Sequence, residues 1–332
     1  MRIAVTGAGG RLGGAVTAAL TLRRPLDNVV SVESWSRPLL DLDRPDTLAA
    51  LVRERRPDVV VHCAAWTDVD ACAREPELAM RRNGEATTVL ATTCTEAGTD
   101  LLFVSTNEVF DGRRTDGRPY VEDDEPAPAN AYGRSKRVGE EGVLRAFEWT
   151  GAGDPRGWIV RTAWLFGPPG LDFPAKIVTA AARAAATGTP LRLVADETGS
   201  PTRAADLASM LVELLRARPP SNTYHLVNAG RATRAEWARA VLLGIDLAVQ
   251  TEDVPADAWT RGSVPPAWAV LGSDRAIGHG LLMRDWRAAL ADELPRYRGL
   301  LAESAAEGGS GAGGTAGPPA DELPGRNAGS AR

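Results

Sequence analysis

The chain begins MRIAVTGAGGRLG, residues 1–13, and this stretch decides the fold that the sequence predicts. A β-branched run, Arg2 to Thr6, leads into glycines spaced GxxGxxG and then into an Ala/Leu-rich helical segment, Leu12 to Leu22. After a strand, such glycines permit a tight turn, let the backbone approach a pyrophosphate, and let the helix pack on the strand. The helix N-terminus adds free N–H groups with partial positive charge. We therefore predict a dinucleotide-binding loop with the cofactor-binding residues Gly7, Gly10, Arg11, Leu12 and Gly13.

Strand-like and helix-like segments alternate beyond this loop. Apolar or β-branched runs predict strands at 29–32, 59–63, 101–105, 158–162 and 223–227. Helical patterns lie between several of them, at 47–56 and 77–97. Buried strands that alternate with helices of ten or more residues are typical of parallel βαβ units. The predicted fold class is therefore α/β, a doubly wound Rossmann-type parallel sheet.

The second half of the chain is more broken and predicts a smaller, discontinuous C-terminal substrate lobe. We expect the dinucleotide-binding domain at 1–165, completed by 196–228, and the substrate-binding lobe at 166–195 and 229–302. From Glu303 onward the composition shifts to Gly, Ser and Pro. Such a segment buries too little apolar area to offset its ordering entropy, so we predict a disordered tail at 303–332.

Charge and composition exclude several function classes. The formal net charge of −5 argues against nucleic acid as a partner, because nucleic-acid binders usually carry a basic face. No apolar stretch approaches the ~20 residues that a membrane span needs, and the N-terminus lacks a signal-peptide pattern. The three cysteines lack metal-ligand spacing, so no metal site is predicted from them. We expect a cytoplasmic enzyme.

The adenosine ribose of a dinucleotide is normally read at the end of the second strand. Here Glu33 would accept hydrogen bonds from a 2′-hydroxyl and favour NADH, whereas Ser34, Ser36 and Arg37 would hold a 2′-phosphate and favour NADPH. Both cofactors, and a role for these residues as solvated loop charges, stay open. Farther along, Asp41-Leu42 is a candidate for the adenine pocket.

A tyrosine and a lysine four residues apart, Tyr132 and Lys136, lie on one face of a predicted helix. A nearby ammonium stabilises a phenolate and lowers the pKa of the phenol, which suits the pair to acid–base chemistry. A third hydroxyl, from Ser105 or Thr106, stands at the end of the predicted strand at 101–105. Because strand C-termini line the ligand crevice of a doubly wound sheet, such a hydroxyl is placed to help polarise a substrate carbonyl, and a role in capping the strand stays open.

Several longer motifs make the chain resemble the dTDP-4-dehydrorhamnose reductase family of extended short-chain dehydrogenase/reductases, over roughly residues 1 to 300. The resemblance is strongest in elements more discriminating than GxxGxxG or YxxxK. These elements are PDVVVHCAAWTDVD (57–70), EPE (75–77), STNEVFDG (105–112), YGRSK (132–136), RTAWLFG (161–167), GSPT (199–202), YHL (224–226) and DWR (285–287).

This resemblance implies NAD(P)H-dependent reduction of the C4 keto group of a nucleotide-linked 4-keto-6-deoxyhexose. It implies that Tyr132 is the acid, Lys136 its partner and a cofactor contact, and Thr106 the catalytic hydroxyl. By position it adds Ala64 and Ala65 to the cofactor-binding residues. The substrate-binding residues that it implies are Thr67, Asn107 and Trp164. Known relatives often form homodimers, some with Mg²⁺, for which the sequence offers no locatable ligand set.

The chain also departs from the family pattern. Asn107-Glu108 stands where the family usually has Asp-Tyr, and Pro265-Pro266 and Ala269 replace an expected arginine and serine. Arg203, or other positive charges near it, is a candidate for holding the phosphates of the substrate. Two alternatives remain at this point: another extended short-chain sugar-nucleotide epimerase or dehydratase, and a noncatalytic NADP-binding regulatory subunit.

Overall fold

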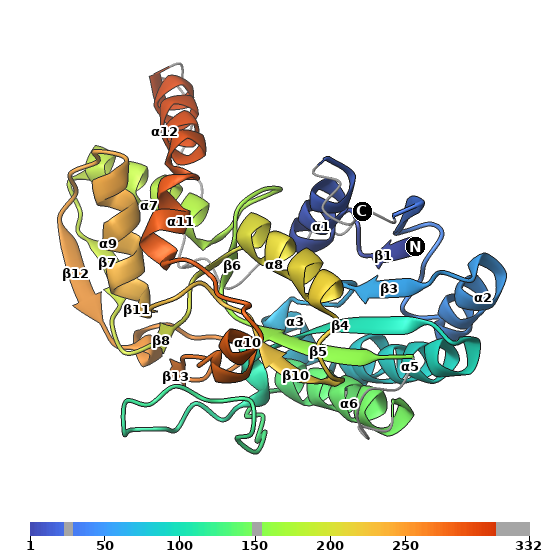
Figure 1. Cartoon of the computed structure of the whole chain (residues 1–332). Helices are drawn as coiled ribbons and strands as arrows, with labels where there is room; N and C mark the ends of the chain where they lie inside the picture. Colours follow the sequence, from blue (N-terminus) through green and yellow to red (C-terminus); the bar gives the residue numbers. More distant parts are fainter. Residues whose placement is uncertain (23–28, 148–154, 310–332) are drawn as a thin grey trace.

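The computed structural model describes residues 1–22, 29–147 and 155–309. Its centre is a parallel sheet in the order β2-β1-β3-β4-β5-β10 (Figure 1), which confirms the predicted fold class. The strands are β1 (Arg2–Thr6), β2 (Ser31–Trp35), β3 (Val59–His62), β4 (Asp100–Thr106), β5 (Gly157–Thr162) and β10 (Asn222–His225). Strand β1 lies between β2 and β3, so the strand order reverses there, and a doubly wound sheet binds its ligands beside such a point.

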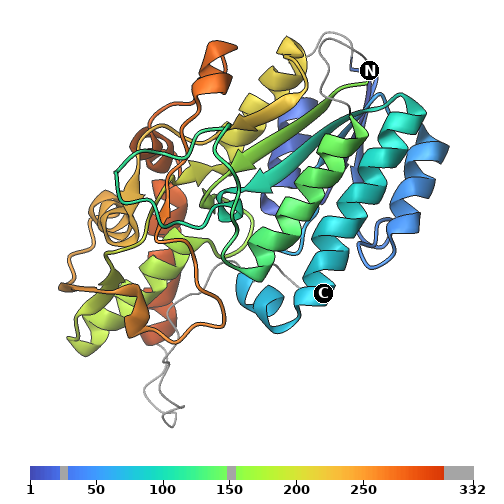
Figure 2. The ribbon, with the colours of Figure 1, turned by 90° about the horizontal axis from the view of Figure 1, so that it is seen from below.

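Helices cover both faces of the sheet. One face carries α1 (Arg11–Leu22) and α8 (Ala204–Ala217). The other carries α2 (Pro45–Arg55), α5 (Ala86–Ala97) and α6 (Ala131–Ala146), which lie side by side in Figure 2. Alternate strand residues enter the two cores: Val59 and Val61 pack with α1 and α8, whereas Val60 packs with α2 and α5. This two-sided burial explains why β3 is apolar throughout.

Two predicted elements differ from the structure. Strand β2 spans Ser31–Trp35 rather than 29–32, because Trp35, and not Val32, is the residue opposite Thr6 at the end of β1. The predicted helix at 77–97 is three pieces: α4 (Pro76–Ala79), a π-helical stretch η1 (Met80–Glu85) and α5. A short helix, α3 (Val69–Arg74), precedes them.

A smaller lobe packs at the C-terminal end of the sheet (Figure 1). Its core is aromatic and includes the buried side chains of Trp237, Trp286 and Tyr297. The elements of the lobe are β6 (Leu165–Phe166), α7 (Phe173–Thr187), β7 (Leu191–Val194), β8 (Thr198–Gly199), β9 (Thr202–Arg203), β11 (Ala232–Thr233), α9 (Arg234–Gly244), β12 (Thr251–Val254), η3 (Ala256–Ala258), β13 (Trp268–Ala269), α11 (Trp286–Ala291) and α12 (Leu294–Gly309).

Pairing and packing shift the predicted domain limits. Strand β8, expected within the dinucleotide-binding part, pairs with β11 and β13 of the lobe. Helix α10 (Asp274–Gly278), expected in the lobe, instead contacts β10, and its Ala276 joins the core beneath α1 and α8. Helix α12 continues to Gly309, so the prediction of a disordered tail from 303 is wrong for residues 303–309. The rest of that predicted tail lies outside the described residues.

A buried ion pair ties α6 to the sheet and generates a stability prediction. The Arg161 guanidinium on β5 donates two hydrogen bonds of 2.8 Å to the Glu140 carboxylate on α6, and both side chains are buried. Burial raises the pKa of Glu140, but the charge and hydrogen bonds of Arg161 outweigh it and hold that pKa below its usual range.

We expect Glu140→Gln to lower the free energy of unfolding by about 3–5 kcal/mol, because it leaves a buried guanidinium uncompensated. The measurement is urea denaturation at neutral pH. The matched control is Glu141→Gln, whose side chain is partly exposed on the same helix and should change stability by no more than about 0.5 kcal/mol. Equal effects of the two substitutions would contradict the prediction.

Candidate active site

The glycine loop lies at the point where the strand order reverses. Gly7 has a φ of +65°, and a Cβ added to it would lie 2.8 Å from the Cα of Ala64, at the end of β3. A Cβ on Gly13 would lie 2.2 Å from the carbonyl oxygen of Gly7, so α1 packs directly on the loop. The first turn of α1, which contains Arg11, Leu12 and Gly13, follows at once. These contacts make the turn tight and place the N-terminus of α1, with its free N–H groups, directly after the strand, which is the arrangement that binds a diphosphate.

The segment after β3 carries three predicted contacts: Ala64, Ala65 and Thr67. The Ala64 N–H donates to the Thr6 hydroxyl over 3.0 Å, which anchors the start of this segment to β1. Farther along, Asn83 accepts from the Trp66 N–H over 2.8 Å and donates to the Trp66 carbonyl oxygen over 3.0 Å.

Asn83 also joins this segment to the predicted catalytic helix, because its amide donates to the Ser135 hydroxyl on α6 over 3.1 Å. Asn83 is not among the predicted site residues. It is buried within η1, and such π-helical stretches are frequent at functional sites.

The end of β2 bears on cofactor choice. The Gly7 N–H donates to the Trp35 carbonyl oxygen over 2.8 Å, so Ser36 and Arg37 are the residues that follow the strand beside the glycine loop. Glu33 lies two residues earlier, opposite Ala4, and accepts from the Trp35 indole over 3.1 Å. The predicted adenine-pocket residues differ in their surroundings. Asp41 accepts from the Asp43 N–H, and Leu42 packs against the same core as Ala64.

Thr106, Tyr132 and Lys136 come from two neighbouring elements. Thr106 ends β4, and the other two lie on the first turns of α6, which begins after Asn130. The Lys136 ammonium is buried; it donates to the Val104 carbonyl oxygen over 2.8 Å and lies 4.1 Å from the centre of the Phe103 ring. The structure therefore brings the predicted triad to the C-terminal edge of β4.

Burial sets the protonation states of this group. It lowers the pKa of Lys136 to about 7, with Glu140 acting in the opposite direction. Burial also raises the pKa of Tyr132 above its usual value, and the nearby Thr106 side chain offsets part of that rise. At neutral pH Tyr132 therefore carries its proton and can act as an acid, while the Lys136 ammonium gives up its proton more readily than an exposed lysine does.

The turn after Thr106, η2 (Asn107–Val109), links the hydroxyl to the start of α6. The Thr106 hydroxyl donates to the Asn107 side-chain oxygen over 3.3 Å and accepts from the Glu108 N–H over 3.2 Å. Asn107 Nδ2 is buried and has no hydrogen-bond partner in the part of the chain that the structure describes, which suits the predicted substrate contact.

Glu108, a departure from the family pattern, has a positional role that sequence reasoning missed. Its carboxylate accepts from the Asn130 amide over 2.7 Å. The Asn130 side-chain oxygen in turn accepts from the Gly133 N–H over 2.8 Å and caps α6. The buried Glu108–Asn130 bond thus fixes the first turn of the helix that carries Tyr132.

Three predicted residues are engaged by other side chains or by the backbone. Arg11 donates from Nε to the Gly167 carbonyl oxygen over 2.6 Å, so its side chain reaches the lobe. One face of the Trp164 indole is covered by the Arg234 guanidinium, 3.6 Å from a ring centre, which removes that face as a sugar platform. Arg203 is already surrounded by the carboxylates of Asp206, Asp292 and Glu293, so the interpretation that it holds phosphates is wrong.

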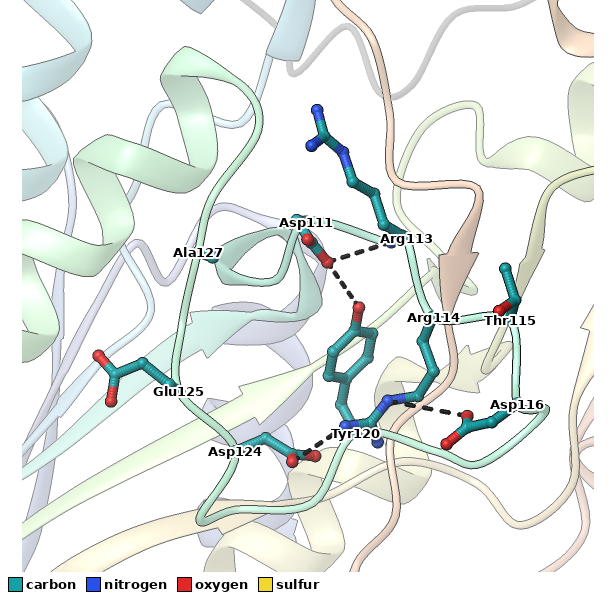
Figure 3. A pocket seen from close by; sticks show the side chains of 9 residues that line it. All are labelled: Asp111, Arg113, Arg114, Thr115, Asp116, Tyr120, Asp124, Glu125 and Ala127. Carbon is teal, nitrogen blue, oxygen red and sulfur yellow. Dashed lines mark hydrogen bonds and ion pairs between the residues drawn. The ribbon is translucent and has the colours of Figure 1, made fainter.

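A surface hollow of about 490 Å³ lies over the loop at 111–127 and contains none of the predicted site residues (Figure 3). Its charged groups are largely paired with one another. Tyr120 donates to Asp111 over 2.7 Å, and Arg114 forms an ion pair of 3.0 Å with Asp124. Figure 3 shows Glu125 directed away from these pairs. We therefore place the active site at the sheet edge and not in this hollow.

Membrane-spanning helices and metal-binding clusters are both absent from residues 1–22, 29–147 and 155–309. No helix there is long and apolar enough to span a bilayer. Within the same ranges, no three His, Cys, Asp or Glu side chains are grouped so that they could hold a metal ion such as Mg²⁺.

Comparison with known proteins identifies the family. A family model described as the RmlD substrate binding domain matches residues 1–298. The chain is 39% identical over 302 residues to a dTDP-4-dehydrorhamnose reductase of Streptomyces griseus, covering 89% of this chain and 93% of that protein. The chain belongs to the dTDP-4-dehydrorhamnose reductase family.

Two other relatives broaden this family context. A dTDP-4-keto-6-deoxy-D-glucose reductase of Streptomyces niveus is 37% identical over 297 residues, covering 88% of this chain and 96% of that protein. The crystal structure of the dTDP-4-dehydrorhamnose reductase of Bacillus anthracis in complex with NADP is 29% identical, with a TM-score of 0.75, and covers 87% of this chain and 97% of that one. The family therefore includes proteins named for different keto sugars.

The pKa of Lys136 predicts how stability depends on pH. The ammonium titrates near pH 7 in the folded chain and near 10.5 when unfolded, so the unfolded state binds more protons between these values. The cost of burying the charge is full below pH 7 and fades as the pH rises toward 10.5. Relative to Lys136→Met, the wild-type free energy of unfolding should rise with pH across this window, by at most about 1.4 kcal/mol per unit.

Denaturant unfolding of the cofactor-free protein at a series of pH values measures this slope. The matched control is Arg134→Met, which removes an exposed cation from the same helix and should give a difference that does not change with pH. A flat difference for Lys136→Met would mean that the ammonium keeps its ordinary pKa.

Proposed function

We propose that this chain reduces the C4 keto group of a nucleotide-linked 4-keto-6-deoxyhexose with NAD(P)H, in deoxysugar biosynthesis. The observation that carries the proposal is the position of Thr106, Tyr132 and Lys136, at the same edge of the sheet as the Gly7–Ala64 approach. The family relatives named as reductases of dTDP-linked keto sugars support the substrate class.

The loop geometry fits a dinucleotide, because Gly7 and Gly13 pack on backbone atoms with no space for a side chain, so the turn is tight and the N-terminus of α1 lies directly beside it. The glycine loop, Ala64, Ala65 and Lys136 would hold it, and the chemistry that it supplies when bound is a hydride for the carbonyl carbon. Tyr132 donates its proton to the carbonyl oxygen as negative charge develops there. The Lys136 ammonium stabilises the phenolate that remains, and Thr106 orients the oxygen through its hydroxyl.

Within this function we propose a preference for NADPH. The two residues that follow β2 beside the glycine loop are Ser36 and Arg37, a hydroxyl and a cation suited to a 2′-phosphate. The carboxylate that would favour a 2′-hydroxyl, Glu33, is paired with the Trp35 indole inside the strand. Formation of a homodimer and location in the cytoplasm stay predictions.

Tyr132→Phe should lower turnover by roughly 10²–10⁴, the usual contribution of a positioned general acid, and leave NADPH affinity nearly unchanged. Turnover is measured as the rate of NADPH oxidation in the presence of dTDP-4-keto-6-deoxyhexose. The assay is run with and without an added 3,5-epimerase, a separate enzyme that inverts C3 and C5 of the sugar. Calorimetry measures NADPH binding. Tyr224→Phe removes the same atom from a buried tyrosine of β10 and is the matched control. Full activity of Tyr132→Phe would show that the proton comes from another group.

Arg37→Ala should weaken NADPH binding by about tenfold, the value of one charge-assisted hydrogen bond, and leave NADH binding unchanged. The exposed Arg44, which pairs with Asp46 at the start of α2, gives the control variant Arg44→Ala. Calorimetric titration with each cofactor decides the question. Equal losses for NADH and NADPH would remove Arg37 from the 2′-phosphate site.

A further inference from the structure

Two arginines of the lobe share one buried glutamate. The Glu197 carboxylate accepts from Arg261 Nη1 over 2.5 Å and, through its other oxygen, from Arg234 Nε over 3.5 Å. Glu197 and Arg234 are buried, and Arg261 is about a quarter exposed. These three side chains form what we call the Glu197 cluster.

The Glu197 cluster carries excess positive charge. Glu197 is the one carboxylate that acts on the Arg234 guanidinium among the described residues, and Arg261 repels it. Burial lowers the pKa of Arg234 to about 10, which reflects this weak compensation. Taking a charge out of water costs several kcal/mol unless it is paired and hydrogen-bonded. Two guanidiniums on one carboxylate therefore leave a net positive charge that a second anion would neutralise.

Arg203 provides the contrast within the same lobe. Three carboxylates lie within 3.3 Å of its guanidinium, and Arg284 shares two of them, so three negative charges face two positive ones and an anion would be repelled. Arg234 has the opposite balance, with a single carboxylate at 3.5 Å. The charge balance around each arginine, and not the residue type, marks the Glu197 cluster as the anion site.

The Glu197 cluster lies beside the proposed active site. Arg234 stacks on the Trp164 indole, and Trp164 follows Thr162, the residue opposite Thr106 in the sheet register. From the other side, Arg261 belongs to a loop that is fixed to the catalytic helix, because Asn130 donates to the Val264 carbonyl oxygen over 3.3 Å. The same loop is held by Asp70, whose carboxylate accepts from the Ser263 N–H over 2.9 Å.

We propose that Arg234 and Arg261 bind the diphosphate of the nucleotide-linked sugar, while its keto group faces Thr106 and Tyr132. This inference rests on the proposed function. Guanidinium forks match phosphate oxygens, and the stack on Trp164 holds the Arg234 fork in a fixed plane. A diphosphate supplies the anionic charge that Glu197 alone does not.

Calorimetric titration of the full-length protein with dTDP and with thymidine, in the presence of NADPH, tests this subsite directly. Arg261→Gln and Arg234→Gln should each weaken dTDP binding by about 10-fold or more and leave NADPH binding unchanged. Thymidine, which lacks the phosphates, should bind wild type and variants alike. In turnover, both variants should raise KM for the dTDP-sugar with little change in kcat.

Arg239→Gln is the matched control. Arg239 lies on the same helix, α9, but its guanidinium pairs with Asp253, outside the Glu197 cluster. Its dTDP affinity should equal that of wild type. Arg234→Lys keeps the charge without the fork and should bind dTDP between wild type and Arg234→Gln. Thermal unfolding of each variant shows whether it folds, and Arg261→Gln, at a partly exposed site, carries the test if Arg234→Gln does not fold.

The outcomes separate this inference from the proposed function. Unchanged dTDP affinity in folded Arg261→Gln would overturn the subsite. If wild type binds UDP or GDP instead of dTDP, with the same dependence on Arg261, the diphosphate subsite stands and the thymidine part of the proposed substrate is wrong. If wild type binds none of these diphosphates, the subsite is overturned, and the keto-reductase activity is judged by the turnover assay alone.

Discussion

The buried bond between Glu140 and Arg161 is the constraint on which the active site depends. Glu140 lies one turn after Lys136 on α6, and Arg161 belongs to strand β5 of the sheet, so the pair helps to set how far the helix stands from the sheet. That spacing lets Lys136 reach the Val104 carbonyl oxygen over 2.8 Å. The Glu140 charge also raises the pKa of Lys136 against the effect of burial. One ion pair thus supports both the position of the ammonium and its charge.

Lysine is rare in this chain, which makes the Lys136 ammonium unusual among its basic groups. Only two of the 38 basic residues are lysines, Lys136 and Lys176. A guanidinium stays charged under almost all conditions and binds as a planar fork, whereas an ammonium is a compact charge whose pKa moves readily on burial. Of the two lysines, Lys136 is buried and Lys176 is only partly buried. The arginines instead serve fixed pairing, as at Arg161 and Arg203.

The sequence predicted the sheet well because its signals are local. Apolar runs such as Val59–Val61 and the glycines after β1 specify buried strands and a close turn without knowledge of their neighbours. Strand β2 was predicted too early, because SVESW looks polar and only pairing with β1 shows that Trp35 is buried at its end. That shift matters for chemistry, since it moves Glu33 away from the end of the strand. The Glu108–Asn130 bond and the Glu197 cluster join residues far apart in sequence, so no local sequence pattern predicts them.

These long-range contacts also connect the lobe to the helix that carries Tyr132 and Lys136. The loop that contains Arg261 is bonded both to Asn130, the cap of α6, and to Glu197 in the lobe. Binding an anion at the Glu197 cluster would therefore act on the same loop that contacts the start of α6. The Asn130 side chain bonds to Glu108, in the turn after Thr106, to Gly133 on α6 and to Val264 in the loop of Arg261. Three separate segments therefore meet at this one amide. A substitution at Glu108 or Asn130 should thus change substrate positioning more than cofactor binding, since the glycine loop has its own contacts with β3 and α1.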